Sequence, residues 1–314
     1  MLMDLRERAR SARNSILVPM RARRIRGMAT DTPSERFERY RSLSLEEWHK
    51  VVLDSIEGLA SLPMPTFPSV DQQAAYVGNS NVVAMWEGWN FYCLMAKERQ
   101  RHGLELGVAS NVLDFGCGWG RYARLFLHDV PASNIWCADP LEEALEMCRA
   151  TDVPGHLVQL PVVPPSELSE GTFATAVAYS VFSHLSPTAH DTWRVELARI
   201  MAPGGIAFVT TQPRSFLDHC QTMRDHPERA TTDWYRKLQG SFVDHDDSVR
   251  RYEAGEFLFE ATGIAGSALE RDLYGEAVVP RLQFVERWAP DFELLEFIDD
   301  PERSRQAVAV LRRT

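Results

Sequence analysis

From residue 111 onward, short apolar runs alternate with amphipathic stretches. The apolar runs have the length and residue types of buried strands, and they are NVLDF, NIWCA, HLVQL, FATAVAY and GIAFVTT. The stretches between them carry apolar residues at helical spacing, and they are RYARLFLHD, LEEALEMCRA and PTAHDTWRVELARIMA. Ser186 is placed to cap the last of these helices, and PGG at 203–205 to end it. This alternation predicts an α/β fold with a mostly parallel sheet covered by helices on both faces.

The pattern before residue 106 is helical. Apolar residues follow Ser44 at helical spacing, and Ser44 is a suitable cap before Glu46 and Glu47. The proline-rich segment 63–69 cannot continue that helix. NVVAMWEGWNFYCLMAKERQRHG then predicts a second helix that leads into the sheet. We therefore expect an N-terminal helical region over residues 31–105 and an α/β domain over 106–314.

The C-terminal part contains an insertion and a hairpin. Residues 212–291 are rich in aromatic residues and interrupt the alternation of strands and helices. FELLEFI and QAVAVLR read as two strands, and their short connection DDPERSR predicts an antiparallel pair. We expect the insertion to form a cap over the substrate, between the fifth and sixth strands of the sheet.

Composition narrows the class of partner. The chain has 314 residues, 45% of them hydrophobic, and a net charge of -10, which argues against a surface built for nucleic-acid phosphates. It contains no run of about 18 apolar residues, so no membrane span is expected. Residues 1–30 hold eight arginines, and we interpret them as a basic, flexible arm, a contact for an anionic partner or a transit peptide. A small-molecule partner and a cytoplasmic location are expected, whereas the oligomeric state is left open.

The cysteines suit neither a disulfide framework nor a zinc site. Their number is odd, their spacing is wide, and none forms a CxxC pair. We expect them to be small apolar core residues of a protein in a reducing compartment. They are Cys93, Cys117, Cys137, Cys148 and Cys220.

The stretch VLDFGCGWGR carries the clearest chemical signal. Its glycines stand at 116, 118 and 120, but a dinucleotide-binding loop needs a further glycine where this chain has Arg121. Asp114 would repel a pyrophosphate and attract an ammonium or sulfonium group. The loop therefore indicates a cationic cofactor without phosphates.

These residues resemble the first motif of class I S-adenosylmethionine (SAM)-dependent methyltransferases. The resemblance covers about 108–212 and the last two strands, and it implies a Rossmann-like seven-stranded sheet with one antiparallel strand. SLPMPTFPS, YVGNSN and YGEAVVPRLQFVERW are similar to bacterial small-molecule methyltransferases that often accompany glycosyltransferases. That similarity implies methylation of a hydroxyl on a sugar or glycosylated metabolite.

The resemblance also assigns a cofactor site. Asp139, at the end of the second strand, would bind both ribose hydroxyls of SAM. Gln159 and Leu160 would lie at the adenine, and Tyr179 and Ser180 at the methionine part. The full set of implied cofactor residues is Asp114, Gly116, Cys117, Gly118, Gly120, Arg121, Asp139, Pro140, Gln159, Leu160, Tyr179 and Ser180.

His184 is the candidate catalytic residue. A hydroxyl acceptor needs a base, and histidine titrates near neutral pH; a capping or packing role for His184 stays open. Substrate candidates are Tyr76, Tyr252, Glu256, Tyr274, Glu276 and Arg281. His190, Asp191, His219 and His245 are interpreted as surface residues.

Several alternatives remain beside this reading. The acidic run DHDDS at 244–248 looks like a solvated loop, so metal-independent transfer is expected. The text AYSVF after the fourth strand lacks the Asn/Asp-Pro-Pro-aromatic motif of nucleic-acid methyltransferases and the paired glutamates of protein arginine methyltransferases. N-methylation of a small amine, and a SAM-binding partner subunit without turnover, stay open.

Overall fold

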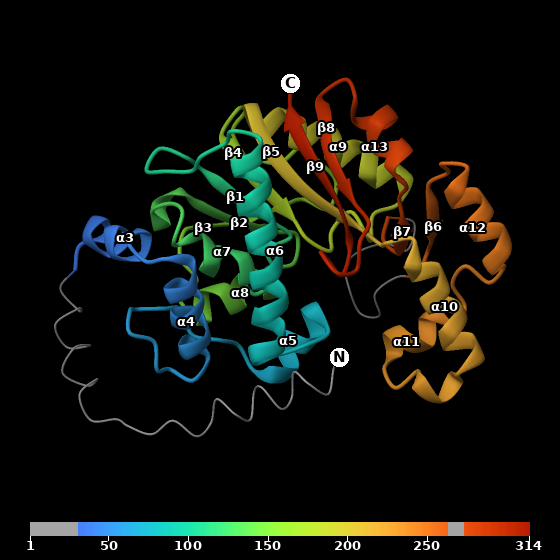
Figure 1. Ribbon diagram of the computed structural model, residues 1–314, viewed down its shortest axis with the longest axis horizontal. Coiled ribbons are helices and arrows are strands. Elements are labelled where there is room, and N and C mark those ends of the chain that lie inside the picture. The colour runs from blue at the N-terminus through green and yellow to red at the C-terminus, as the bar shows by residue number, and fades with distance from the viewer. Residues whose placement is uncertain (1–30, 263–272) are drawn as a thin grey trace.

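The computed structural model describes residues 31–262 and 273–314, so the predicted basic arm at 1–30 lies outside the described residues. A seven-stranded sheet forms the centre of the described chain (Figure 1), in the order β3-β2-β1-β4-β5-β9-β8. Its strands are β1 (Val112–Phe115), β2 (Ile135–Asp139), β3 (His156–Gln159), β4 (Phe173–Ala178), β5 (Met201–Thr211), β8 (Phe292–Ile298) and β9 (Ala307–Arg313).

The predicted mostly parallel sheet is confirmed. Strands β1 to β5 pair in parallel, and β9 pairs antiparallel with both β5 and β8. The β8–β9 hairpin is the one predicted from FELLEFI, DDPERSR and QAVAVLR. Because the strand order changes direction between β1 and β4, the carboxyl ends of these two strands border the crevice in which open α/β sheets bind ligands.

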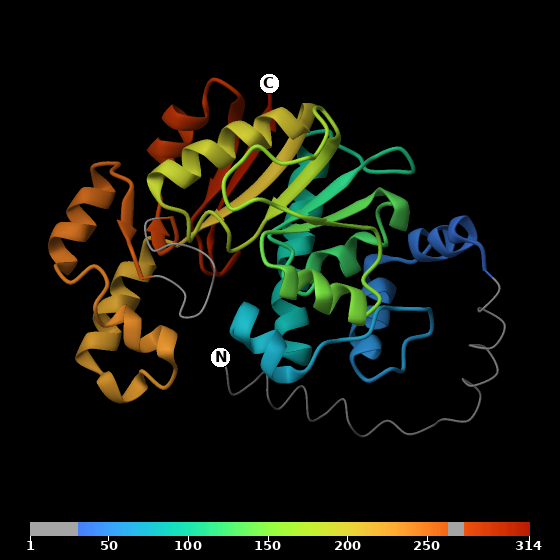
Figure 2. The ribbon, with the colours of Figure 1, turned by 180° about the vertical axis from the view of Figure 1, so that it is seen from behind.

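Helices cover both faces of the sheet, as the alternation of the sequence predicts. Val112 packs with α6 (Asn81–Arg101), α7 (Arg121–Phe126) and α8 (Glu142–Ala150). Leu113 points to the opposite face, where α9 (Pro187–Ile200) and α13 (Arg281–Trp288) complete a second core. Figure 2 shows α9 lying across that second face. The period of two along β1 thus places Asp114 on the same side as α7.

The N-terminal region is helical, as predicted. It consists of α3 (Pro33–Arg41), α4 (Leu45–Ile56), α5 (Val70–Val77) and α6. Ser44 caps α4 through a reciprocal pair of bonds, because its backbone N–H donates to Glu47 Oε2 (2.8 Å) and its hydroxyl accepts from Glu47 N (3.3 Å). None of these helices, nor any other in the described part of the chain, is long and apolar enough to cross a membrane.

Arg124 fastens the proline-rich linker to the glycine loop. Its buried guanidinium donates to the carbonyl oxygen of Thr66 and lies over the rings of Phe67 and Trp119, 4.6 and 5.3 Å from their centroids. Thr66 N also donates to Thr151 O (2.9 Å). The linker is therefore held in place beside the loop, and α5 follows directly from it.

The insertion has a small core of its own. Its helices α10, α11 and α12 pack around Leu217, Leu238 and Val278. Strands β6 and β7 form an antiparallel pair beside the main sheet. Helix α13 instead packs against the sheet. The segment that lies outside the α/β core therefore ends before α13, earlier than the predicted end at residue 291. The elements of the insertion are α10 (Ser215–Asp225), α11 (Asp233–Leu238), α12 (His245–Glu253), β6 (Leu258–Glu260) and β7 (Glu276–Val278), with a short 3₁₀ turn at Pro227–Arg229. Another 3₁₀ turn, Ala132–Asn134, lies outside the insertion and precedes β2.

One predicted boundary is wrong. Helix α9 ends at Ile200 rather than at PGG, and residues 201–205 already belong to β5. Met201 pairs with Phe173, and the register shifts before the next pair of Thr175 with Ile206. Pairing with β4 thus captures this segment, and the φ of +78° at Gly204 accommodates the resulting irregularity.

Candidate cofactor and acceptor site

The glycine loop follows β1 and turns tightly against two neighbouring segments. Gly116 has φ +72°, and a Cβ on it would lie 2.4 Å from Cγ2 of Val181 in the turn after β4. Gly118 has φ +53°, and a Cβ there would lie 3.0 Å from the ring of Tyr76 on α5. These positions therefore require glycine both for their backbone conformation and for the close approach of their neighbours.

The backbone N–H groups of the loop are used within the protein. Gly116 and Cys117 donate to Ala138 O (2.7 and 3.1 Å), Gly120 donates to Cys117 O (2.9 Å), and Gly118 donates to Asp139 Oδ2 (2.9 Å). A phosphate-binding loop directs such groups at its ligand. This loop instead presents a carboxylate beside satisfied amides, which fits a cofactor without phosphates, as the sequence predicts.

Asp139 lies at the carboxyl end of β2, in the centre of this site. Its Oδ2 accepts from Gly118 N and its Oδ1 accepts from Leu141 N, both at 2.9 Å. Burial raises the pKa of Asp139, and the two amide donors oppose that rise. Each carboxylate oxygen keeps a further lone pair, so Asp139 is able to accept hydrogen bonds from two ribose hydroxyls.

Asp114 has a role that the sequence did not indicate. Its Oδ2 accepts from Ala123 N (3.1 Å), which ties β1 to the first turn of α7. Burial raises its pKa to about 7, against the lowering effect of the Ala123 amide and the nearby Arg121. A cationic ligand close to Asp114 would favour its charged form, so both the structural and the electrostatic roles are compatible.

Arg121 points away from the crevice, toward α6. Its guanidinium donates to Ala84 O (3.3 Å) and to the Tyr122 hydroxyl (3.1 Å). It also lies 5.0 Å from the ring centroid of Tyr179, one of the predicted methionine contacts. The Arg121 side chain therefore packs against the ring of Tyr179 and helps to hold it in position.

The predicted adenine contacts lie beside Asp139. Gln159 pairs with Asp139 across β2 and β3 and is exposed, and Pro140 directly follows Asp139. Leu160 is buried, and its N–H donates to Asp139 O (3.0 Å). These residues form one side of the crevice. Under the loop, Cys117 and Cys148 direct their thiols at Gly118 O (3.7 and 3.3 Å). All five cysteines are free, and all are buried as expected except Cys93, which is half-buried.

His184 stands on the turn after β4 with both ring nitrogens in hydrogen-bonding contact. Nδ1 lies 2.8 Å from Gly275 O, and Nε2 lies 3.3 Å from Ser180 Oγ. A carbonyl oxygen only accepts, so Nδ1 carries the proton. Nε2 of the neutral ring is then an acceptor, and its lone pair faces Ser180.

The polarity at Ser180 agrees with this tautomer. Gln306 Nε2 donates to Ser180 Oγ (3.1 Å), which leaves the Ser180 hydroxyl hydrogen for His184. Thr210 accepts from Ser180 N (2.7 Å) and in turn donates to Gln306 Oε1, which fixes the amide orientation. Ser180 also has φ +59°, unusual for a residue with a side chain. Sequence reasoning missed Gln306, which follows the predicted hairpin connection and has no motif around it.

Glu276 enters the site from the insertion, at the start of β7. It is 2% exposed, and its carboxylate accepts from Gln212 Nε2 (2.7 Å) and Trp234 Nε1 (2.8 Å). Its Oε2 also lies 3.6 Å from His184 Nδ1. Gln212 and Trp234 were not among the predicted site residues.

Tyr274 packs on His184, and Tyr76 packs on Gly118. The Tyr274 ring stacks on His184 with centroids 5.0 Å apart and planes 13° apart. Burial, together with Glu276 and Asp139, raises the pKa of Tyr274. Burial and the charge of Asp139 raise the pKa of Tyr76 to about 12. Tyr76 thus lies on the glycine loop, on the cofactor side of the site.

Three other sequence candidates lie away from His184. Tyr252 is buried in the insertion, where its hydroxyl donates to Asp299 Oδ2 (3.1 Å). Glu256 Oε2 accepts a hydrogen bond from Arg251 Nε (2.8 Å). Arg281 is exposed at the start of α13. The structure therefore brings together only Tyr274 and Glu276 of the five candidates other than Tyr76.

The surface assignment of His190 is wrong. The residue is 0% exposed and lies among the rings of Phe182, Phe257, Phe284 and Trp288. Burial lowers its pKa to about 3, with smaller contributions from Arg287 and Arg194. His190 lies on the face of α9 that packs against the second core. Burial of that apolar face stabilises the fold by more free energy than hydration of one imidazole ring would, so the ring is buried with it.

The acidic run at 244–248 begins helix α12 rather than forming a loop. Asp244 caps the helix by accepting from Asp247 N (3.0 Å), and His245 is bonded to Asp218 (2.8 Å). Within residues 31–262 and 273–314, no three His, Cys, Asp or Glu side chains are grouped so that they could hold a metal ion.

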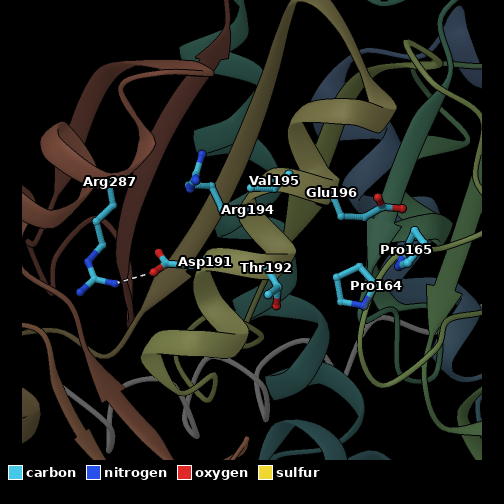
Figure 3. Close-up of a pocket in the computed structure, with 8 residues that line it drawn as sticks. All are labelled: Pro164, Pro165, Asp191, Thr192, Arg194, Val195, Glu196 and Arg287. Atoms are coloured by element: carbon cyan, nitrogen blue, oxygen red, sulfur yellow. Dashed lines mark hydrogen bonds and ion pairs between the residues drawn. The ribbon is translucent and has the colours of Figure 1, made fainter.

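A separate surface groove of about 580 Å³ lies along the outer side of α9 (Figure 3). Pro164 and Pro165 line one side, and Arg287, paired with Asp191 (2.9 Å), lines the other. No predicted cofactor or substrate residue lines this groove. The groove is therefore distinct from the site built around Asp139 and His184.

Residues 112–205 match the family model described as a methyltransferase domain. The match begins at β1 and contains the glycine loop, Asp139 and the turn of Ser180 and His184. No curated protein matches the chain.

Solved methyltransferase structures are similar to the chain. A SAM-dependent methyltransferase from Mesorhizobium loti is 12% identical, with 69% of this chain and 96% of that chain covered and a TM-score of 0.46. The 1,6-didemethyltoxoflavin N1-methyltransferase of Burkholderia thailandensis is 15% identical (79% and 92% covered, TM-score 0.43). PKMT2 from Rickettsia typhi, in complex with AdoHcy, is 17% identical (66% and 49% covered, TM-score 0.41).

Proposed function

We propose that this chain, a class I SAM-dependent methyltransferase, methylates a hydroxyl group of a sugar or glycosylated small molecule, with His184 as general base. The observation that carries the proposal is the tautomer of His184. Its Nδ1 is held by Gly275 O at 2.8 Å, so its Nε2 presents a lone pair. A base in this state suits a hydroxyl acceptor, whose neutral oxygen is a poor nucleophile until its proton is removed.

In this proposal SAM supplies an electrophilic methyl group on its sulfonium. Asp139 would accept hydrogen bonds from the ribose hydroxyls, and Asp114, Gly116, Cys117, Gly118 and Gly120 would form the loop that holds the cofactor. Pro140, Gln159 and Leu160 would bind the adenine, and Tyr179, held by Arg121, would bind the methionine part together with Ser180. Tyr76 lies over the loop on Gly118.

The acceptor hydroxyl takes the place of the Ser180 hydroxyl at His184 Nε2 and gives up its proton there. The imidazolium so formed lies 3.6 Å from Glu276 Oε2, and this carboxylate stabilises it. Glu276 is able to do so because Gln212 and Trp234 hold it in place. Tyr274, stacked on the ring, keeps His184 from rotating away from this position.

The test is an assay of S-adenosylhomocysteine formation with SAM and two acceptor panels, methyl pyranosides and small primary amines. We expect turnover with a pyranoside, and a loss of 10²- to 10⁴-fold in kcat for His184→Ala. Calorimetric affinity for S-adenosylhomocysteine should change little in this variant. His156→Gln, an exposed histidine on β3, is the matched control and should keep full activity.

Turnover of amines alone, undiminished in His184→Ala, would establish N-methylation in place of the proposed reaction. Cofactor binding without turnover on either panel would favour a non-catalytic SAM-binding partner.

A further inference from the structure

Helix α11 holds a partly exposed indole beside the proposed base. Trp234 is 36% exposed, yet its Nε1 donates to Glu276 Oε1 at 2.8 Å, and Glu276 is buried. The polar atom of the side chain therefore faces inward, and the exposed part is apolar ring. Leaving such a surface in water costs hydrophobic free energy that a bound ligand would recover.

The indole is fixed relative to His184 through a single carboxylate. One oxygen of Glu276 accepts from Trp234, and the other lies 3.6 Å from His184 Nδ1 and accepts from Gln212 Nε2 (2.7 Å). Because Glu276 is held by two donors, the ring of Trp234 has a defined orientation. The indole of Trp234 and the ring of His184 are thus linked through the carboxylate of Glu276.

His219 supplies a polar group beside the indole. Its ring is nearly parallel to that of Trp234, with centroids 6.3 Å apart and planes 28° apart, and the Phe216 ring lies 6.4 Å from that of His219 and 6.3 Å from that of Trp234. Burial and the nearby charge of Arg305 lower the pKa of His219, which favours the neutral ring. In the part of the chain that the structure describes, no hydrogen bond to this ring is formed. A neutral imidazole has one donor and one acceptor to offer.

The size of the apolar surface fits a small ligand. Between residues 215 and 262, Trp234 and Val243 are the exposed large apolar residues of the described chain. A stable protein interface needs several hundred square ångströms on each partner, more than one ring provides. A pyranose has one face of C–H groups and a rim of hydroxyls, and this arrangement matches an apolar ring beside a donor and an acceptor.

We propose that the exposed face of Trp234 binds the C–H face of a pyranose ring and that His219 hydrogen-bonds one of its hydroxyls. The pyranose ring is thus the part of the acceptor that the insertion recognises. The link between this subsite and methyl transfer rests on the proposed function. The insertion thus contributes both the ring platform and, through Glu276, the support of the base.

Fluorine NMR of the full chain labelled with 5-fluorotryptophan tests the subsite without turnover. The protein is saturated with S-adenosylhomocysteine and titrated with methyl pyranosides of glucose, galactose, mannose and rhamnose. Trp234→Phe assigns the resonance of interest. Trp86→Phe assigns a control, since Trp86 is 42% exposed on α6. We expect at least one pyranoside to shift the Trp234 resonance saturably and to leave the Trp86 resonance unchanged.

Absence of a shift with every pyranoside, or equal shifts of both resonances, would overturn the subsite. A shift with benzyl alcohol but with no pyranoside would do the same, because it would assign the ring to aromatic acceptors. These outcomes are independent of the proposed function, which fails separately if wild-type protein methylates no pyranoside.

Kinetics separate recognition from a structural role. With a pyranoside that is methylated, Trp234→Ala should raise KM about tenfold, and Trp234→Phe should recover part of the loss because a ring remains. His219→Ala should raise KM for that pyranoside but not for the analogue that lacks the bonded hydroxyl. A fall in kcat with unchanged KM in Trp234→Ala would mean that the indole acts only by holding Glu276, and the ring subsite would be rejected.

Discussion

Replacement of Asp139 by asparagine should weaken cofactor binding strongly. In the structure its two oxygens accept from Gly118 N and Leu141 N, both at 2.9 Å. Asparagine has one oxygen and one NH₂ group, so one of these amides would face another donor. Asparagine also offers the ribose hydroxyls a single, neutral acceptor oxygen in place of a carboxylate. The loss of one ribose hydrogen bond to a charged acceptor costs about 1.5 to 3 kcal/mol, or roughly 10- to 100-fold in affinity.

Calorimetric titration of S-adenosylhomocysteine measures this loss. Burial raises the pKa of Asp139, so the titration is made at pH 8, which favours the charged carboxylate. Asp191→Asn is the control, because Asp191 lies on α9 and pairs with Arg287 outside the site. Its affinity should equal that of the wild type.

The 2′-deoxy analogue of S-adenosylhomocysteine separates the ribose contact from damage to the loop. The wild type should bind this analogue more weakly than S-adenosylhomocysteine, and Asp139→Asn should lose most of that preference, with a coupling of about 1 kcal/mol or more. Equal affinity of the wild type for both ligands would refute the ribose assignment. So would an affinity of Asp139→Asn within about threefold of the wild type.

Two further predictions concern the loop and its support. Gly116→Ala should destabilise the fold by about 2 kcal/mol or more, because φ is +72° and the new Cβ would lie 2.4 Å from Val181 Cγ2; urea unfolding at the wild-type midpoint would contradict this. Burial raises the pKa of Asp114 to about 7, so its contribution to stability is present below pH 4 and is lost as the pH rises to 7. The free energy of unfolding of Asp114→Asn should therefore rise relative to that of the wild type by up to about 1.4 kcal/mol per pH unit between pH 4 and 7. A difference between the two proteins that is constant with pH would show that Asp114 keeps its ordinary pKa.

Local patterns were enough to predict the architecture. A strand such as VLDF and a helix such as α4 depend on residues a few positions apart, so periodicity and the Ser44 cap indicate them directly. The β8–β9 hairpin is equally local, since its connection is short. The spacing of the glycines, the arginine at 121 and the aspartate at 114 also pointed to a cofactor without phosphates, because these residues are neighbours in the chain.

Ser180, Tyr274 and Glu276 were candidates from the sequence, but their contacts with one another and with Gln306 and Trp234 escaped sequence reasoning for a physical reason. His184 meets Gly275 across 91 positions, Ser180 meets Gln306 across 126, and Trp234 meets Glu276 across 42. No local pattern encodes such contacts, because they arise when the insertion and the hairpin pack against the carboxyl end of the sheet.

The same reason explains why His190 was wrongly assigned to the surface. A residue on a helix is polar by its own chemistry but buried or exposed by what packs against it, so His190 on α9 was assigned to the surface and lies among aromatic rings. The contact of Tyr76 with Gly118 likewise depends on the linker that Arg124 holds in place. Helices, strands and the loop motif follow from short-range periodicity and backbone preference, whereas the contacts of His184 with Gly275 and of Ser180 with Gln306 follow from the packing of segments far apart in the chain.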